Sequence, residues 1–313
     1  MRIVFMGTPA FAVASLKALA ESGQHEIAGV VTQPDRPKGR GKKMLATPVK
    51  EYALAQGYTV YQPDRVKTPE FIEVLRELQP ELIVVAAFGQ FLPRGILTLP
   101  KYGCINVHAS LLPKYRGAAP IQYAIIKGEQ ESGVTIMQMD IGMDTGAMLN
   151  KIAVPITPNM TMGELHDELM TKGAELLLQT IGQVADGTVA AEPQQEEEAT
   201  YASLLTREME RIDWRRPAAE LHNLIRGFNP EPSTYTTLPD GKKLKLYGSL
   251  LTEKTTQAAP GTVAEVAKTS FFVACGDGRL LEITEVQPES KKRMPAQVFL
   301  NGRGVQAGDV MVF

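Results

Sequence analysis

The sequence predicts an α/β domain with a doubly wound, mostly parallel Rossmann-like sheet, followed by a small β-barrel domain. In the first half of the chain, short apolar runs alternate with helical patterns, which is typical of a parallel sheet covered on both faces. Beyond residue 207, short alternating runs are separated by turn signals such as Asp240-Gly241 and Asp277-Gly278, which is typical of antiparallel strands in a small barrel. A glutamate-rich stretch with few large apolar residues separates the two patterns. We therefore expect a first domain over residues 1–188, a solvated linker over 189–206 and a second domain over 207–313.

Each element follows from its local pattern. Residues 3–6 form an apolar strand that ends at Gly7-Thr8-Pro9, and residues 82–87 form a continuous apolar strand. The sequence Thr161-Met162-Gly163-Glu164 is a capping-box pattern that begins a long helix ending near Gly187. The other strands of the first domain are expected at 27–31, 58–61, 105–108, 134–139 and 149–155, and its other helices before residue 22 and at 49–56 and 69–78. In the second domain we expect a helix at 217–227 and strands at 244–246, 261–266, 271–274, 280–286 and 310–313.

Composition restricts the class of protein. The chain has 33 basic and 35 acidic residues and a net charge of −2, so any surface that binds nucleic acid must be local. The two cysteines cannot form a disulfide framework, which fits a reducing cytosol. No run of about eighteen apolar residues is present, and the apolar start of the chain is too short for a signal peptide. We therefore expect a cytoplasmic protein without a membrane span.

Asn106 and His108 are the most informative pair of polar residues. They are two apart on an expected strand, so both side chains lie on the same face. They fall where the strand gives way to a loop, and ligand sites in open α/β sheets lie at the carboxyl ends of strands. Asp144 follows the expected strand 134–139 in a loop that contains Gly142 and Gly146, and is the third candidate.

An amide, an imidazole and a carboxylate on neighbouring strand ends can perform acyl transfer to an amine. Asn106 and His108 can donate hydrogen bonds to the developing oxyanion, and His108 can move protons near neutral pH. Asp144 can orient the imidazole, directly or through water. The spacing alone leaves open that His108 is structural, that Asn106 caps a turn and that Asp144 forms an Asx turn.

Other chemistries have less support in the sequence. The four histidines, at positions 25, 108, 166 and 222, are too few and too dispersed for a metal cluster, so we expect no metal. Gly7-Thr8-Pro9 does not form the GxGxxG fingerprint, which disfavours a nicotinamide-dependent enzyme.

Longer motifs resemble the folate-dependent formyltransferases. They are PELIVVAAFGQFLP at residues 80–93, GCINVHASLLPKYRGAAP at residues 103–120 and GMDTG at residues 142–146. The resemblance implies that 10-formyltetrahydrofolate is the formyl donor and that Asn106, His108 and Asp144 are catalytic. It also implies that the folate binds beside the loop 88–92, the loop before Asp144 and the loop 110–113. The implied folate contacts are Phe88, Gly89, Gln90, Leu92, Ser110, Leu111, Leu112 and Pro113.

A basic insertion at residues 33–43 bears on the formyl acceptor. It has five basic residues against one acidic residue, and its glycines favour mobility. Such a run is usually a solvated loop, but beside an acyl-transfer site it can clamp phosphates. The segment resembles the loop with which the methionyl-tRNA formyltransferases of this family grip the acceptor end of the initiator tRNA, and Arg40 matches the principal arginine of that loop. The expected RNA contacts of the insertion are Arg36, Lys38, Arg40, Lys42 and Lys43.

The second domain resembles the oligonucleotide-binding-like (OB-like) barrel of the same enzymes, through the motifs RIDW at residues 211–214 and IRGFNP at residues 225–230. Its candidates for RNA backbone contact are Lys242, Lys243 and Lys245, the cluster Lys291-Lys292-Arg293, and Arg207 beside the linker. Ordinary turn lysines are the alternative interpretation. Phe11 can line an apolar pocket for the methionine side chain, or it can pack its helix against the sheet.

The resemblance therefore implies transfer of a formyl group to the α-amino group of methionyl-initiator tRNA, by a protein that we expect to be monomeric. One alternative is a folate-dependent formyltransferase that acts on an amino sugar or another small amine. Another is a catalytically idle protein whose barrel binds RNA.

Overall fold

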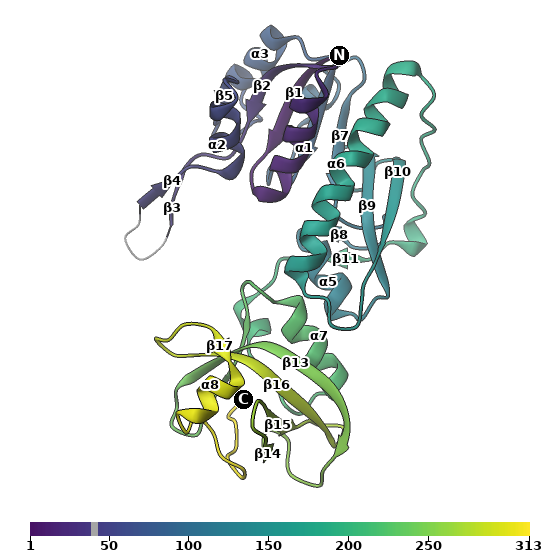
Figure 1. Cartoon of the computed structure of the whole chain (residues 1–313). Helices are drawn as coiled ribbons and strands as arrows, with labels where there is room; N and C mark the ends of the chain where they lie inside the picture. Colours follow the sequence, from purple (N-terminus) through teal and green to yellow (C-terminus); the bar gives the residue numbers. More distant parts are fainter. Residues whose placement is uncertain (39–42) are drawn as a thin grey trace. The chain divides into compact units, whose positions relative to one another are not determined.

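The computed structural model describes residues 1–38 and 43–313 and divides into two compact units (Figure 1). The first unit comprises Met1–Pro120, Ser132–Val154 and His166–Ala202. The second comprises Ile121–Glu131, Pro155–Leu165 and Ser203–Phe313. Two short segments that precede residue 166 therefore belong with the C-terminal unit, and the segment from residue 189 to Ala202 belongs with the first unit.

A seven-stranded sheet forms the centre of the first unit. Its strands, in spatial order, are β10 (Met148–Pro155), β9 (Glu131–Gln138), β7 (Cys104–His108), β6 (Leu82–Ala86), β1 (Arg2–Gly7), β2 (Glu26–Val31) and β5 (Val60–Tyr61). The strands from β7 to β5 pair in parallel, whereas β9 runs antiparallel to β7. The mostly parallel sheet predicted from the sequence is confirmed.

Helices cover both faces of this sheet. They are α1 (Ala10–Ser22), α2 (Pro48–Ala55), α3 (Pro69–Leu78), α4 (Arg94–Leu97) and α6 (Met162–Asp186). On one face, Val4 and Ile83 share a buried cluster with Phe71 of α3. On the other face, α6 packs so closely that a Cβ added to Gly173 would lie 3.3 Å from Val107. This two-sided cover is the doubly wound arrangement, and it explains why the strands are continuously apolar.

Side chains at the helix N-termini fix where the helices begin. Thr47 and Thr68 each accept a hydrogen bond from the main-chain N–H three residues later, and a proline follows each of them. The capping box predicted at the start of α6 is present, because Glu164 accepts from the Thr161 N–H at 2.7 Å and the Thr161 hydroxyl accepts from the Glu164 N–H at 3.3 Å.

A six-stranded antiparallel sheet dominates the second unit. Its strands are β12 (Thr234–Thr237), β13 (Lys243–Thr255), β16 (Arg279–Pro288), β15 (Phe271–Ala274) and β14 (Val263–Val266), with β17 (Met294–Pro295) beside β16. Its helices are α5 (Pro120–Ile126), α7 (Ala218–Gly227) and α8 (Ala296–Asn301). The 3-10 turn η2 (Arg207–Glu210) precedes α7, and the turn η1 (Glu196–Glu198) lies in the first unit.

The last residues of the chain close this sheet into a barrel. Val312 bridges to Thr237 on β12, and Val310 bridges to Thr262 beside β14, so one short segment joins both edge strands. The interior is apolar, and the indole of the buried Trp214 donates its N–H to the Thr236 hydroxyl at 3.0 Å. The predicted small barrel is confirmed, although β13 is longer than expected and the sequence did not indicate β12.

Candidate active site

Strand β7 places Asn106 and His108 on one face of the sheet, as the period-two spacing predicted. Asn106 lies in register between Val85 of β6 and Met137 of β9, so apolar side chains flank its amide. Among residues 1–38 and 43–313, no hydrogen bond engages this amide. His108 follows at the end of the strand with its side chain only 6% exposed. The pair therefore combines a half-buried amide without a hydrogen-bond partner among the described residues with a buried imidazole ring.

The two ring nitrogens of His108 have different surroundings. Nε2 lies 3.0 Å from the main-chain carbonyl oxygen of Tyr115, so in this geometry Nε2 carries a hydrogen and donates it. Nδ1 lies 3.6 Å from Oδ2 of Asp144. This distance is longer than a direct charge-assisted hydrogen bond of about 2.8 Å. The two groups can therefore interact electrostatically, and both can bond a small group that enters between them.

Asp144 reaches His108 by a route that the sequence did not predict. We expected the three groups on neighbouring strand ends, but β9 runs antiparallel to β7, so it ends beside Ile105 at the start of β7. The loop after β9 folds back toward the other end of β7. Asp140 stabilises the turn, because its Oδ1 accepts from the Gly142 N–H at 2.9 Å and from the Thr145 hydroxyl at 2.7 Å.

The carboxylate of Asp144 is held in place by a main-chain donor. The N–H of Gly117 donates to Oδ2 at 2.9 Å, the same oxygen that faces His108. Gly117 belongs to β8 (Arg116–Gly117), which pairs in parallel with β11 (Tyr201–Ala202). Its φ of 115° and the nearby carbonyl of Ala202, 2.7 Å from an added Cβ, both require glycine here.

The stretch expected to be a solvated linker also contacts the Asp144 loop. The side-chain amide of Gln194 donates to the main-chain carbonyls of Asp144 at 2.7 Å and Gly146 at 2.8 Å, and its oxygen accepts from Arg116. The glutamates nearby are exposed, as expected of a solvated segment. Sequence reasoning missed Gln194 and Arg116, because a glutamine in a polar stretch carries no local signal of its partners.

The loop 110–113, expected to contact folate, turns most of its side chains inward. Ser110, Leu112 and Pro113 are buried, and the Ser110 hydroxyl donates to the Lys114 carbonyl at 2.6 Å. The buried Thr135 of β9 holds the loop, donating to the Ser110 carbonyl at 2.7 Å and accepting from the Leu112 N–H at 3.1 Å. Further main-chain groups of the loop are paired, because Lys114 N donates to Leu111 O and Thr200 N donates to Pro113 O, so the partly exposed Leu111 side chain is what the loop offers to a ligand.

The loop after β6 is anchored in a similar way. The carbonyl of Phe88 accepts from Thr8 and from Gln33, each at 3.1 Å. The side chain of Gln90 bonds the Val66 N–H at 3.0 Å and the Pro63 carbonyl at 3.5 Å, so the fold already uses it. Phe88 and Leu92 are buried, and Gly89 has a φ of 85°.

Three exposed apolar side chains in these loops were missed by the sequence reasoning. Phe91 is 68% exposed, next to the buried Leu92, and Ile141 and Met143 are 79% and 47% exposed in the loop before Asp144. Large apolar side chains that remain in solvent on loops beside polar site residues are candidates for ligand contact.

Phe11 is packed within the first unit. Its ring is buried on α1 and meets the ring of His166 on α6 edge to face, with 5.6 Å between ring centroids. The helix-packing alternative describes this placement, so the geometry gives no support to a role in a methionine pocket.

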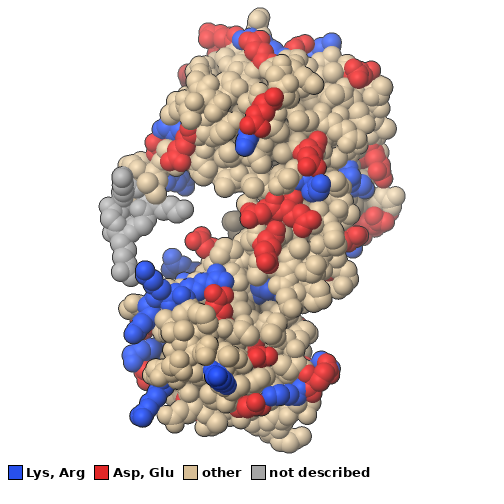
Figure 2. Space-filling view, viewed as in Figure 1, with Lys and Arg blue, Asp and Glu red and all other residues tan. Residues whose placement is uncertain are grey.

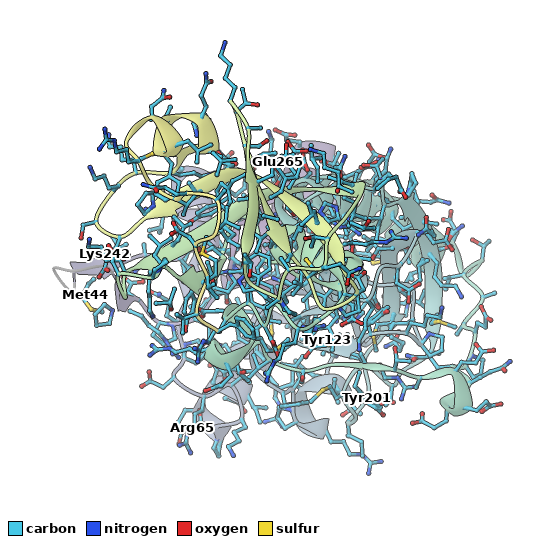
Figure 3. The ribbon with its side chains drawn as sticks, turned by 90° about the horizontal axis from the view of Figure 1, so that it is seen from below. Met44, Arg65, Tyr123, Tyr201, Lys242 and Glu265 are labelled. Atoms are coloured by element: carbon cyan, nitrogen blue, oxygen red, sulfur yellow. The ribbon has the colours of Figure 1, made fainter. Side chains whose placement is uncertain are left out.

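The basic insertion forms a hairpin of β3 (Arg36–Lys38) and β4 (Lys43–Leu45). Arg40 and Lys42 lie outside the described residues. Arg36 is exposed at the start of the hairpin, and so is Met44, which Figure 3 labels. At its base, Asp35 accepts from Lys50 and from Gln62, each at 2.7 Å. These hydrogen bonds lower the pKa of the Asp35 carboxyl, Lys50 contributing most.

Lys and Arg side chains gather on one side of the C-terminal unit (Figure 2). Arg207, Lys245, Lys291 and Lys292 are exposed. Lys242, labelled in Figure 3, pairs with Asp240 at 2.6 Å, and Lys243 lies over the Tyr235 ring at 4.2 Å.

Arg293 forms an ion pair with Glu285, donates a hydrogen bond to Asn229 and lies over the ring of Tyr247. Arg293 therefore has a structural role that its neighbours Lys291 and Lys292 do not share.

The thiol of Cys104, at the start of β7, does not add a nucleophile to the site. Burial raises its pKa to about 12, so the thiol stays protonated at neutral pH. Among residues 1–38 and 43–313, no group of three or more His, Cys, Asp and Glu side chains is arranged to hold a metal ion, and no helix is long and apolar enough to cross a membrane.

Solved structures with this fold are distantly related. A sugar 3N-formyltransferase, WlaRD, solved with dTDP and 5-N-formyl-THF, matches with a TM-score of 0.66 at 21% identity, over 93% of this chain and 99% of that one. HypX from Aquifex aeolicus, solved with tetrahydrofolic acid, matches with a TM-score of 0.65 at 17% identity, over 100% of this chain and 51% of that one. At these identities the likeness shows the fold alone.

Sequence relatives are much more similar over the whole length. The methionyl-tRNA formyltransferases of Acetivibrio thermocellus and Bacillus subtilis are 49% and 51% identical, each over 99% of this chain and over 99% and 97% of their own lengths. The formyl transferase family model matches residues 1–181, and the model of the formyl transferase C-terminal domain matches residues 204–304. The chain therefore belongs to the formyltransferase family, in the group of the methionyl-tRNA formyltransferases.

Proposed function

We propose that the chain transfers the formyl group of 10-formyltetrahydrofolate to the α-amino group of methionyl-initiator tRNA in the cytoplasm, giving formylmethionyl-tRNA for translation initiation. The observation that carries the proposal is the 3.6 Å approach of His108 Nδ1 to Asp144 Oδ2 beside Asn106, on the same face of β7. The sequence identity of 49% and 51% to two methionyl-tRNA formyltransferases, over nearly the whole chain, supports the tRNA acceptor.

Asn106 stabilises the charge that develops on the formyl oxygen. When the amine adds to the formyl carbon, the carbonyl oxygen becomes anionic and requires a hydrogen-bond donor. The Asn106 amide can supply one, and its neighbours in register, Val85 and Met137, are apolar and do not compete for it.

His108 moves the proton. Because Nε2 donates to the Tyr115 carbonyl, Nδ1 is the atom that takes a proton from the attacking amine and returns it to the nitrogen that leaves as the carbon–nitrogen bond breaks. The carboxylate of Asp144, 3.6 Å away, stabilises the imidazolium formed between the two transfers. The Gly117 N–H keeps this carboxylate aimed at Nδ1.

The two anchored loops fit a folate donor, which supplies the activated formyl group when it is bound. Phe91, Ile141 and Met143 offer exposed apolar surface for a flat heteroaromatic ring. Main-chain groups of the 88–92 loop can bond the polar edge of such a ring, since the buried Phe88 and Leu92 anchor that loop.

Basic residues of the hairpin and the barrel bind the tRNA backbone in this proposal. The exposed lysines of the barrel carry no specificity for a base, so they should contribute through phosphate contact and release of counterions. Arg293 should contribute to the fold instead, because Glu285 and Tyr247 already engage it.

A small-amine acceptor is the alternative that an experiment should exclude, because a sugar 3N-formyltransferase, WlaRD, has the same fold. The two candidates separate in an assay of Arg40→Leu with charged initiator tRNA and with an amino sugar. We expect lower tRNA-dependent turnover and a weaker salt dependence for Arg40→Leu. Arg76→Leu is the matched control, because Arg76 lies on α3 and pairs with Glu73. Unchanged turnover in Arg40→Leu, or faster formylation of the amino sugar by the wild type, would favour the small acceptor.

A further inference from the structure

Gln194 holds the main chain of the Asp144 loop. One side-chain amide nitrogen donates to two carbonyls, those of Asp144 at 2.7 Å and Gly146 at 2.8 Å. Asp144 has a φ of 54°, in the left-handed region, which residues other than glycine adopt uncommonly, although Asp does so more readily than most. Surrounding contacts must over-determine such a conformation for it to persist. Gln194 supplies one of these contacts from fifty positions further along the chain.

Arg116 fixes the position of Gln194. Its guanidinium is buried at 1% exposure, and its Nε donates to the Gln194 oxygen at 3.0 Å. Its Nη1 donates to Glu196 at 2.8 Å and approaches the hydroxyl of Tyr201, labelled in Figure 3, at 3.5 Å. All of these partners come from the same segment, residues 194–201. A planar donor set of this kind restricts the direction in which the Gln194 amide can point.

The same segment also sets the donor to the carboxylate. Arg116 N donates to Thr200 O and Ala118 N donates to Ala202 O, both at 2.8 Å. These bonds leave the intervening Gly117 N–H pointing away from β11 and toward Asp144 Oδ2. Residues 194–202 therefore hold Asp144 at both ends, at its carbonyl through Gln194 and at its carboxylate through β8.

We propose that Gln194 is a positioning residue for Asp144, with Arg116 as the buried group that orients it. Gln194 does not touch the reacting atoms. It keeps the Asp144 main chain in the left-handed conformation from which the carboxylate faces His108 Nδ1. The inference rests on the proposed function for the role of Asp144, but the contacts that carry it are independent of the acceptor.

The experiment compares Gln194→Leu and Gln194→Glu with Gln195→Leu, a matched control on an exposed neighbour. Leucine removes the side-chain N–H groups of Gln194. Glutamate keeps the shape of the side chain but places a carboxylate oxygen, an acceptor, against the carbonyls of Asp144 and Gly146. In steady-state assays with charged initiator tRNA, we expect kcat to fall about 10- to 100-fold in both Gln194 variants, with KM for tRNA changed less than about 3-fold. The kcat of Gln195→Leu should stay within about 2-fold of the wild type.

A double-mutant cycle with Asp144→Asn separates positioning from general destabilisation. Because Gln194 acts through Asp144, Gln194→Leu should lower the single-turnover rate by less than about 2-fold in the Asp144→Asn background. The pH profile of kcat should also change shape in Gln194→Leu, since the surroundings of the proton-carrying ring change. A merely less stable protein would keep the wild-type shape at reduced amplitude.

Two results would overturn the inference: a Gln194→Leu kcat within about 3-fold of the wild type, or the full loss persisting in the Asp144→Asn background. If Gln194→Leu does not fold, as judged by circular dichroism, Gln194→Glu carries the same comparison. A wild-type chain that does not formylate charged tRNA would refute the proposed function itself. A wild type that is active, with Asp144→Asn inactive and Gln194→Leu normal, would refute only the positioning role.

Discussion

Asn106 and His108 are placed by a strand, whereas Asp144 is placed by a loop. On β7 the positions of the two side chains follow from the alternation of the strand and from pairing with β6 and β9. Asp144 lies in a loop that returns along the sheet, and it depends on Gly117, Gly146 and Gln194. The alternation of a strand therefore sets the positions of Asn106 and His108, whereas contacts with residues distant in the sequence set the position of Asp144.

The strand and the loop should respond differently to substitution. A change on the strand removes a chemical group and leaves its neighbours in place, because the sheet holds the main chain. A change around the loop leaves every reacting group present but moves one of them. The first kind should affect chemistry with little effect on folding, and the second should affect geometry.

The largest effect is expected for His108→Ala, the strand side of the comparison. Loss of the proton carrier should lower kcat by about 10²- to 10⁴-fold. The chain should still fold, since β7 remains paired on both sides, but the midpoint should fall because the Tyr115 carbonyl loses its partner and the ring leaves a cavity. A rapid-quench assay of formylated tRNA, together with a melting curve, checks both statements. A rate near that of the wild type would remove His108 from the mechanism.

Gly146→Ala should displace the backbone of the loop that carries Asp144, without removing any reacting group. A Cβ at this position would lie 1.8 Å from the carbonyl oxygen of Gln138, so the backbone must shift. We expect roughly a 10²-fold loss of kcat, because a displacement of about 1 Å at a reacting group has effects of this size. Steady-state kinetics measure it, and normal turnover would show that the loop tolerates displacement.

His222 is a second buried histidine and lies outside the site. Its Nδ1 lies 2.9 Å from the Ser249 hydroxyl and its Nε2 3.1 Å from the Pro158 carbonyl. Burial lowers the pKa of His222 below its usual value of 6.5, although the Pro158 carbonyl partly opposes this and the charge of Arg226 adds to it.

The lowered pKa makes the unfolded chain bind more protons than the folded one as pH falls below 6.5. The free energy of unfolding should therefore be highest above that value and should decrease as pH falls through it. Denaturant titrations of the wild type and His222→Gln at several pH values test this. The decrease should be smaller in His222→Gln, and equal slopes would contradict the assignment.

The smallest effect is expected for Gly182→Ala on α6. Nothing lies within 4 Å of the added Cβ, and the position is exposed inside a long helix. Alanine should raise the free energy of unfolding by about 0.5–1 kcal/mol. Turnover should be unchanged, so the variant is also the control for Gly146→Ala. Chemical denaturation measures the gain, and a loss of stability would contradict the helix packing described here.

Much of the fold could be predicted because the signals are local. The continuous apolar run of β6, the capping box at Thr161 and the paired polar residues of β7 depend only on neighbouring positions. The antiparallel direction of β9 could not be predicted, since strand pairing is decided by contacts far apart in the sequence. The pairing of β12 is a further case, and so is the pairing of the closing segment, which was expected as a strand at 310–313 but without its two partners.

The site was predictable to the same extent. The chemistry of Asn106, His108 and Asp144 follows from their residue types, but the route by which Asp144 reaches His108 does not. Gln194 carries no signal because a glutamine in a glutamate-rich stretch resembles any solvated residue. The resemblance implied a folate contact for Gln90, and nothing in the sequence indicated that its side chain also bonds the Val66 N–H.

The most direct test measures tetrahydrofolate and formylmethionyl-tRNA together, in one reaction with charged initiator tRNA, for the wild type and for Asp144→Asn. The account predicts that the two products form in equal amounts only when charged tRNA is present. It also predicts that Asp144→Asn, while still folded, loses both by about two orders of magnitude or more. Release of tetrahydrofolate without formylated tRNA, or an Asp144→Asn rate near that of the wild type, would contradict the account.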